Sequence, residues 1–229
     1  MIISHQHKFI FVKTEKTAGT SLEIALSKYC GPDDVLSSLT PKDESIRRAL
    51  GYPGAQNYRL PFSQYSVPDA LRCLRLGKPL HFFNHARALF IRNHIDPEAW
   101  HSYYKFCFER NPWDKFVSWY YWTYKGEPRP PIAEAVQSRE FKAFRARGWN
   151  VYTEKSKVIV DRVFRYDQLP QALSEIQEKI GLEELPIMPQ TKNSHRKDKR
   201  AYQEILSRES REIIGESYRE EIDLFDFEW

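Results

Sequence analysis

Hydrophobic positions along this chain alternate between short continuous runs and a helical spacing. Residues 8–13 form an apolar run typical of a buried strand, and residues 22–29 carry apolar side chains at helical spacing. Residues 14–21, between them, are mostly small and polar, and Gly31 and Pro32 end the helical pattern. Strand, glycine-containing loop and helix in this order are typical of the start of an α/β domain.

The same alternation continues to the end of the chain. We predict further strands at 80–84, 104–109, 157–160 and 163–166. We predict further helices at 41–50, 68–76, 86–94, 115–124, 132–147, 167–180 and 209–221. Strands that alternate with helices favour an α/β fold with a central, mainly parallel sheet flanked by helices. We interpret residues 1–229 as a single domain with an irregular insertion at about 31–79, where prolines and glycines recur.

The composition agrees with an ordinary folded domain of 229 residues, of which 41% are hydrophobic and 29% charged. The sequence contains no run of the roughly 18–20 apolar residues that a membrane-spanning helix needs. Its first residues lack the basic and apolar regions of a signal peptide. Three widely spaced cysteines offer neither a disulfide framework nor a metal-binding pair. We therefore expect free thiols and a cytoplasmic protein with no membrane span.

The charge balance is mildly basic, with 35 Lys and Arg against 31 Asp and Glu and a net charge of +4. This excess suits a small anionic ligand, whereas a dedicated nucleic-acid binder usually carries a stronger or more concentrated positive charge. Aromatic residues make up 14% of the chain and crowd into residues 103–124. Core packing is the simplest interpretation of this stretch, and an aromatic platform beside a purine or substrate ring is the alternative.

The first segment with candidate chemistry is the polar turn between the first strand and the first helix. A turn of small residues exposes backbone N–H groups, and the helix N-terminus adds positive potential, so together they can bind an anion. Gly19 lets the backbone approach the anion closely, and Lys16 adds a mobile charge. Hydroxyl donors are available from Thr17, Thr20 and Ser21. A capped turn with a solvated lysine is the simpler alternative.

The second segment runs from Arg110 to Ser118, across the predicted end of a strand and the first turns of a helix. Arg110 offers a planar fork of donors suited to a phosphate, and the Ser118 hydroxyl adds one more donor. The alternative is a structural ion pair between Arg110 and either Asp114 or Glu109.

Together the two segments resemble the signatures of sulfotransferases that use 3′-phosphoadenosine-5′-phosphosulfate (PAPS) as the donor. Residues 16–21 are similar to the family's 5′-phosphosulfate loop, and residues 110–118 to its 3′-phosphate motif. Residues 163–169 resemble the strand-to-helix step that follows, and residues 218–227 the closing segment of the carbohydrate-type branch. The four matches run in family order along nearly the whole chain. The resemblance implies a P-loop-like, three-layer α/β fold with a central parallel sheet and no metal requirement.

The resemblance also implies a role for each residue of the two motifs. Lys16 would stabilise the oxygen that bridges sulfur and the leaving phosphate, while Arg110 and Ser118 would hold the 3′-phosphate that distinguishes PAPS from ATP. The 5′-phosphate would be held by Thr17, Gly19, Thr20 and Ser21. The basic segment 192–200 lies where the family often has a loop over the nucleotide, and a solvated surface loop is the alternative. Its candidate phosphate contacts are Lys192, Ser194 and Arg196.

One residue departs from the family pattern, because Glu15 stands where a proline usually precedes the loop lysine. A carboxylate beside an anionic donor is unfavourable unless it points away from the donor or pairs with a cation such as Lys13.

A hydroxyl acceptor has to lose its proton to a base, and histidine suits that role near neutral pH. Of seven histidines we select His85, which follows the predicted strand 80–84 in a region where related enzymes often carry a base. The reserve candidates are Glu44, Asp43 and Glu15. Because the carbohydrate-type ending matches, a carbohydrate hydroxyl is the first choice of acceptor, and we expect the insertion at about 31–79 to recognise it.

Two other functions stay open beside sulfuryl transfer from PAPS to a hydroxyl by in-line displacement. A P-loop nucleotide kinase or related phosphotransferase would need Lys directly after the loop glycine and an acidic metal ligand on a second strand. A non-catalytic module for anionic polymers, such as sulfated glycans or RNA, would use the basic segment 192–200 and the aromatic stretch 103–124.

Overall fold

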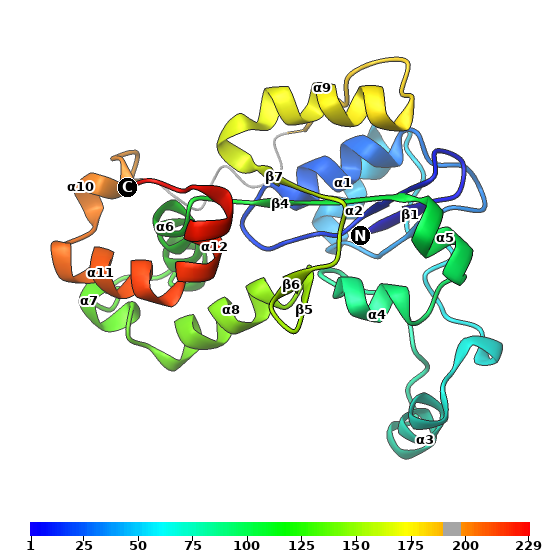
Figure 1. The fold of residues 1–229 in the computed structure, drawn as a ribbon, viewed down its shortest axis with the longest axis horizontal. Helices are drawn as coiled ribbons and strands as arrows, with labels where there is room; N and C mark the ends of the chain where they lie inside the picture. Colours follow the sequence, from blue (N-terminus) through cyan, green and yellow to red (C-terminus); the bar gives the residue numbers. More distant parts are fainter. Residues whose placement is uncertain (190–197) are drawn as a thin grey trace.

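The computed structural model describes residues 1–189 and 198–229, and its centre is a five-stranded sheet (Figure 1). The strands stand in the order β3-β1-β2-β4-β7. Their bounds are Ile2–Ser4 (β1), Phe9–Phe11 (β2), Val35–Leu36 (β3), Tyr104–Glu109 (β4) and Arg162–Arg165 (β7). A separate hairpin pairs β5 (Thr153–Glu154) with β6 (Lys157–Val158). The protein is therefore a mixed α/β structure, as its sequence predicts.

The pairing within the sheet is half parallel and half antiparallel, which corrects the expectation of a mainly parallel sheet. β2, β4 and β7 are parallel neighbours, whereas β1 is antiparallel to both β2 and β3. The sequence pattern misses β1, because three apolar residues beside a polar turn show almost no periodicity. The parallel half is uninterrupted, so the carboxyl ends of β2, β4 and β7 lie at one edge of the sheet.

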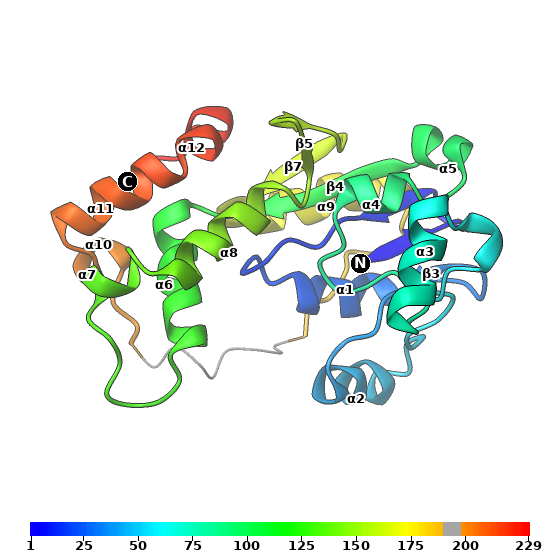
Figure 2. The same ribbon diagram turned by 90° about the horizontal axis from the view of Figure 1, so that it is seen from below.

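Helices cover both faces of the sheet (Figures 1 and 2). On one face, α1 (Gly19–Ser27) and α9 (Leu169–Ile180) pack against phenylalanines of the three parallel strands. On the other face lie α4 (Ala88–Arg92), α5 (Pro97–Ser102) and the end of α8 (Arg139–Trp149). Successive strand side chains point to opposite faces, so each parallel strand supplies both layers. Each large apolar side chain buried in this way contributes about 1.5–3 kcal/mol.

The remaining helices stand beside the sheet. They are α2 (Pro41–Ala49), α3 (Val67–Leu76), α6 (Pro112–Thr123), α7 (Ile132–Ala135), α10 (Tyr202–Ile205), α11 (Arg208–Ser217) and α12 (Arg219–Phe225). Aromatic side chains of α6 form a third apolar cluster with α7, α8 and α11. This cluster confirms core packing as the main role of the aromatic stretch, although Trp122 stays exposed.

Several predicted boundaries differ from the structure. Residues 80–84 form no strand, and His81 makes only a single bridge to Arg59. The predicted helix 132–147 is divided into α7 and α8, because Ser138 caps a new helix there. The predicted helix 209–221 is likewise divided into α11 and α12. Asp167 pairs with Arg165 and does not cap α9, which begins at Leu169. Among the described residues, no helix combines the length and apolar character needed to cross a bilayer.

Candidate functional site

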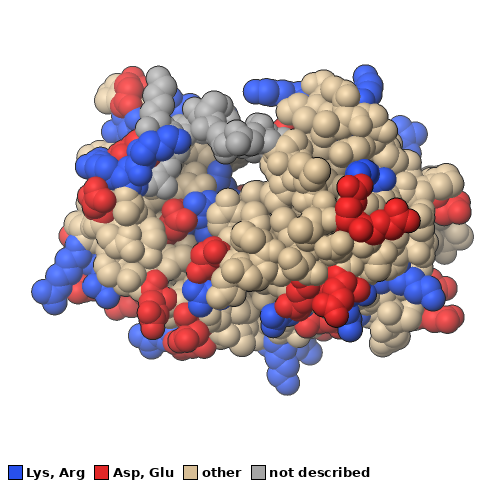
Figure 3. Space-filling model, turned by 90° about the horizontal axis from the view of Figure 1, so that it is seen from above, with Lys and Arg blue, Asp and Glu red and all other residues tan. Residues whose placement is uncertain are grey.

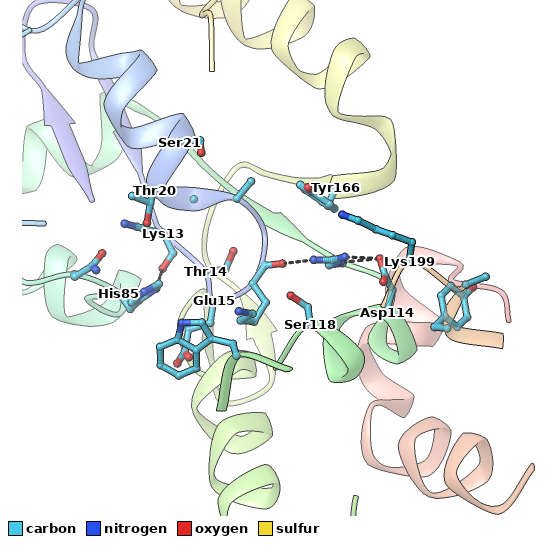
Figure 4. A pocket seen from close by; sticks show the side chains of 18 of the residues that line it. Lys13, Thr14, Glu15, Thr20, Ser21, His85, Asp114, Ser118, Tyr166 and Lys199 are labelled. Atoms are coloured by element: carbon cyan, nitrogen blue, oxygen red, sulfur yellow. Dashed lines mark hydrogen bonds and ion pairs between the residues drawn. The ribbon is translucent and has the colours of Figure 1, made fainter. Parts of the chain in front are cut away.

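A cavity of about 810 Å³ opens at the carboxyl ends of the three parallel strands (Figure 4). Its walls include Lys13 after β2, Arg110 after β4 and Tyr166 after β7. Seen from above in Figure 3, the molecule is hollowed between the side covered by α9 and the side that carries α10. The volume lies within the range of about 300–1,000 Å³ that is usual for ligand pockets. The topology therefore brings the two sequence segments with candidate chemistry to one place.

The loop between β2 and α1 is held in a constrained backbone conformation. Lys16 and Ala18 have φ angles of 65° and 53°, in the left-handed region that non-glycine residues rarely adopt. A Cβ atom on Gly19 would lie 2.8 Å from Lys13 Cγ, so no larger residue fits there without a shift. The Thr14 hydroxyl donates to the carbonyl of Phe108 and so ties the loop to β4. Such constraints cost about 1–3 kcal/mol each and cluster at functional sites.

Three of the predicted anion-binding residues form the first turn of α1 and line the cavity: Gly19, Thr20 and Ser21. Ala18, the N-cap residue, contributes no side-chain cap to this helix end. A helix N-terminus that borders a cavity in this way favours bound anions. Thr17 is different, because its buried hydroxyl lies 3.0 Å from the Thr14 hydroxyl and its side chain does not line the cavity.

Arg110 is fixed from three sides. Its Nη1 donates to the carbonyl of Lys16 at 3.0 Å, and its Nε donates to Asp114 Oδ2 at 2.8 Å. The guanidinium carbon lies 4.9 Å from the centre of the Tyr166 ring. The ion pair with Asp114 that the sequence allows is therefore present, yet Arg110 still lines the cavity together with Ser118. The side chain is held in position by contacts with both motifs.

Lys16 lines the cavity and lies over an exposed aromatic ring. Its Nζ is 5.1 Å from the centre of the Trp122 ring, close enough for a cation–π interaction. Glu15 also lines the cavity, and its Oε1 lies 3.7 Å from Arg147 Nε. The unusual carboxylate is thus paired with an arginine of α8, not with Lys13.

His85 borders the same cavity, as Figure 4 shows, and carries a third left-handed φ, 62°. Its Nδ1 lies 3.0 Å from the Lys13 carbonyl oxygen. Because a carbonyl only accepts, Nδ1 carries the hydrogen and Nε2 keeps a lone pair. Burial, reinforced by the Lys13 ammonium, lowers the pKa of His85 to about 3, so the imidazole is neutral at pH 7. At this pKa the Nε2 lone pair is only a weak base, and an anionic ligand in the cavity would have to raise the pKa before the imidazole could take a proton efficiently.

A buried ion cluster stands behind His85. Lys13 Nζ lies 2.9 Å from Glu23 Oε2, and the Met1 amino group lies 2.9 Å from Glu23 Oε1. All three groups are at most 1% exposed. Burial alone would raise the pKa of Glu23, but the ammonium groups of Met1 and Lys13 lower it to about 2. Lys13 is therefore a structural cation as well as a lining residue.

A second buried cluster lies behind Arg110. Glu109 Oε1 accepts from the Arg110 backbone N–H at 2.8 Å and from Lys115 Nζ at 2.6 Å. Glu221, on α12, is fully buried, and neither of its carboxylate oxygens has a hydrogen-bond partner among the described residues. Its nearest cation is Arg145, 3.8 Å away. Burial, followed by repulsion from Glu109, raises the pKa of Glu221 to about 7.

The structure adds residues that sequence reasoning misses and leaves others aside. The added lining residues include Thr40, Asn84, Tyr166 and Tyr202. Lys199 and Arg200 also line the cavity and belong to the basic segment 192–200 that the sequence analysis singles out. Tyr166 could have been found, since it directly follows a parallel strand. Asp43 and Glu44 do not line this cavity; Asp43 bonds Thr40 and Glu44 pairs with Arg47. Three predicted phosphate contacts lie outside the described residues: Lys192, Ser194 and Arg196.

Comparison with known proteins places the chain in a family. It is 36% identical over 102 residues to an uncharacterized protein of Archaeoglobus fulgidus, and the match covers 42% of this chain and 83% of that protein. The chain belongs to the same family as this archaeal protein, whose description transfers no activity. No family model matches the chain, and no solved structure matches it.

Proposed function

We propose that this protein is a PAPS-dependent sulfotransferase that moves a sulfuryl group to a hydroxyl acceptor. The observation that carries the proposal is the meeting of two sequence motifs, residues 16–21 and 110–118, in the walls of one cavity. The resemblance assigns these motifs to the two phosphate groups of the same nucleotide. Residues 94 positions apart along the chain, Lys16 and Arg110, are joined there by a hydrogen bond.

The residues of the cavity fit the donor. The first turn of α1 and the backbone around Gly19 would receive the 5′-phosphate, as in a P-loop-like fold. Arg110 and Ser118 would hold the 3′-phosphate, and Tyr166 and Asp114 keep the guanidinium oriented. A planar, fixed arginine suits phosphate better than a flexible lysine does.

Two further side chains would serve the transfer itself. Sulfuryl transfer places negative charge on the oxygen between sulfur and the leaving phosphate, and a cation there accelerates the step when it binds that charge most strongly in the transition state. Lys16 is the lining residue that we assign to this role. His85, neutral and with Nε2 as an acceptor, would take the proton of the acceptor hydroxyl. A carbohydrate hydroxyl is the acceptor that we propose to test first.

Ligand-induced thermal stabilisation tests the donor assignment. Adenosine 3′,5′-bisphosphate should raise the melting temperature far more than AMP, because only the former carries a 3′-phosphate for Arg110 and Ser118. At 100 times its dissociation constant, a ligand that binds only the folded state adds about 2.7 kcal/mol. Equal shifts from both nucleotides would contradict the assignment.

Transfer of labelled sulfate to a library of hydroxyl acceptors tests the chemistry. Lys16→Ala should lower turnover by about 10²–10³ while bisphosphate binding is mostly retained. Lys157→Ala, at an exposed lysine of β6, is the matched control and should leave turnover unchanged. Near-normal turnover of Lys16→Ala would refute the role of this lysine.

The choice of co-substrate distinguishes the proposed sulfotransferase from a kinase. A kinase would act with ATP and Mg²⁺, whereas the proposed transfer should proceed with PAPS in the presence of EDTA. The loop favours the latter, because Thr20 stands directly after Gly19, where a Walker A loop has lysine.

A further inference from the structure

The arm formed by residues 59–83 leaves the body of the protein and carries helix α3 at its far end (Figure 1). α3 has no buried residue. Its connection to the body runs through Asp69, whose Oδ2 lies 3.0 Å from His94 Nε2 on the chain after α4. Ser66 and Asp69 form a capping box at the N-terminus of α3, which stabilises the helix locally.

The apolar face of α3 points away from the protein. Val67, Leu71 and Leu74 follow the spacing of one helix face, and they are 76%, 62% and 82% exposed. Asp69, which contacts the body, lies two positions from Val67 and Leu71 and so occupies the opposite side of the helix. Phe62, in the short turn before α3, is 75% exposed as well. An amphipathic helix normally buries this face against its own core, and α3 does the reverse.

The charges of the arm are almost all positive. Arg72, Arg75 and Lys78 are exposed on α3 and directly after it. Asp69 is the sole acid of residues 59–83, and its carboxylate is engaged with Ser66 and His94. The outward surface of the arm therefore combines an apolar stripe with neighbouring cations.

We propose that the arm is a docking surface for an anionic lipid bilayer. An apolar stripe bordered by Lys and Arg is the pattern of helices that lie in the membrane interface, where apolar side chains enter the acyl boundary and cations meet lipid phosphates. Long basic side chains beside the stripe can reach the headgroups while their stems stay apolar. Both the apolar stripe and the neighbouring positive charges therefore favour an anionic bilayer as the partner of this surface.

A second copy of the chain fits this surface less well. In a two-fold dimer through the stripe the same patch of both subunits meets, so the second copy would bring more cations and, from residues 59–83, no acid other than the engaged Asp69. Like charges placed together across an interface cost several kcal/mol in general. An anionic bilayer turns the same cations into a favourable contribution.

Vesicle sedimentation of the full chain tests the proposal, and it needs neither nucleotide nor acceptor. The protein should bind vesicles with about one third phosphatidylglycerol some 10–100-fold more strongly than vesicles of phosphatidylcholine alone, because each basic residue near the surface adds to the attraction. High salt should remove most of this preference. Equal binding to both kinds of vesicle, or to neither, would overturn the proposal and leave the proposed enzymatic function untouched.

Two double variants locate the surface. Leu71→Gln with Leu74→Gln should weaken vesicle binding at least about tenfold, since two apolar side chains no longer enter the interface. Arg72→Gln with Arg75→Gln should weaken binding to anionic vesicles by about tenfold and leave binding to neutral vesicles unchanged. All four positions are exposed, so both proteins should keep the wild-type melting temperature.

The matched control is Leu185→Gln with Ile187→Gln, an exposed apolar pair outside the arm (47% and 76% exposed), which should bind vesicles as the wild type does. Loss of binding in this control, or unchanged binding in the Leu71/Leu74 variant, would contradict the docking surface. A concentration-dependent dimer that the Leu71/Leu74 variant disperses would assign the stripe to a second copy instead.

Discussion

Glu23 and Glu221 are both completely buried, and each stands behind one wall of the same cavity, yet their surroundings differ. Glu23 lies between the Lys13 ammonium and the Met1 amino group, and its pKa falls to about 2. Glu221 has no hydrogen-bond partner within residues 1–189 and 198–229, is repelled by the acidic Glu109, and has a pKa raised to about 7. Burial is common to both carboxyl groups, so the partners decide the charge.

This difference leads us to expect different roles for the two walls of the cavity. The wall of α1 rests on a satisfied ion cluster, which fixes the Lys13 carbonyl and through it the tautomer of His85. The wall of β4 and α6 rests on a cluster with an unsatisfied acid, and Arg110 is bonded directly to that cluster through Glu109. We therefore expect chemistry to depend mainly on the first wall and donor affinity mainly on the second.

The largest expected effect is on turnover at the α1 wall. His85→Ala should lower turnover by about 10²–10⁴, because the acceptor hydroxyl loses its base, while affinity for adenosine 3′,5′-bisphosphate is retained. His81→Ala, an exposed neighbour outside the cavity, serves as the control. Nitrogen chemical shifts of His85 should report a neutral imidazole with hydrogen on Nδ1 down to about pH 4 in the free protein, since its pKa is lowered to about 3. Hydrogen on Nε2 in place of Nδ1 would contradict the assignment, because Nε2 has to accept the proton.

Loss of the Glu23 carboxylate should destabilise the fold. Glu23→Ala leaves the Lys13 ammonium buried without its anion, and breaking such a pair typically costs about 3–5 kcal/mol. Urea unfolding measures the change. Glu178→Ala, on the exposed side of α9, should alter the free energy of unfolding by less than about 0.5 kcal/mol. A Glu23→Ala protein as stable as this control would show that the cluster contributes little.

Glu221 should respond in the opposite sense. Its folded pKa of about 7 exceeds the ordinary glutamate value of 4.5, so the folded state binds more protons than the unfolded state between these two pH values. Stability should therefore fall as pH rises through that window, by about 3 kcal/mol in total. Glu221→Gln should flatten the dependence and stabilise the protein at pH 8. If wild type and variant unfold with the same pH profile, the unsatisfied carboxyl group does not titrate as described.

The smallest expected effect concerns donor affinity at the β4 and α6 wall. Arg110→Ala removes charged hydrogen bonds to the 3′-phosphate, worth about 1.5–3 kcal/mol together, and should raise the dissociation constant of the bisphosphate about 10–100-fold. Turnover at saturating donor should change less. Arg208→Ala, at a strongly exposed arginine of α11, should leave both unchanged. A larger loss in turnover than in affinity would reverse the assignment of the two walls.

The sequence predicts the motif residues that line the cavity better than the buried ionic clusters behind them. Lys16, Gly19 and Arg110 follow strands whose apolar runs are plain in the sequence, and parallel strands bring such positions together. The clusters are invisible at that level. Glu23 lies in a helical pattern, and nothing local indicates that Lys13 and the chain start will enclose it. Glu221 stands in an acidic segment that is typical of a solvated surface, and only tertiary packing buries it.

The expected strand before His85 shows a different limit. Residues 80–84 have the apolar composition of a strand, but the segment joins none of the five strands of the sheet and makes a single bridge, to Arg59. His85 reaches the cavity through its hydrogen bond to Lys13. The residue selected from sequence thus lines the cavity for a reason that the sequence argument did not contain.

The parallel pairing of β2 with β4 affects how the protein folds during and after synthesis. Phe9 pairs with Tyr104, so the site depends on a contact that spans nearly half the chain, whereas β1 and β2 form a local hairpin. Closing so long a loop carries an entropic cost that local contacts do not, and chains dominated by such contacts fold slowly. During synthesis the turn at residues 14–21 would leave the ribosome well before Arg110, so the site could form only after Arg110 has also emerged. Ligand binding should therefore appear late in refolding, after the hairpin, and a nascent chain shorter than β4 should have no affinity for the nucleotide.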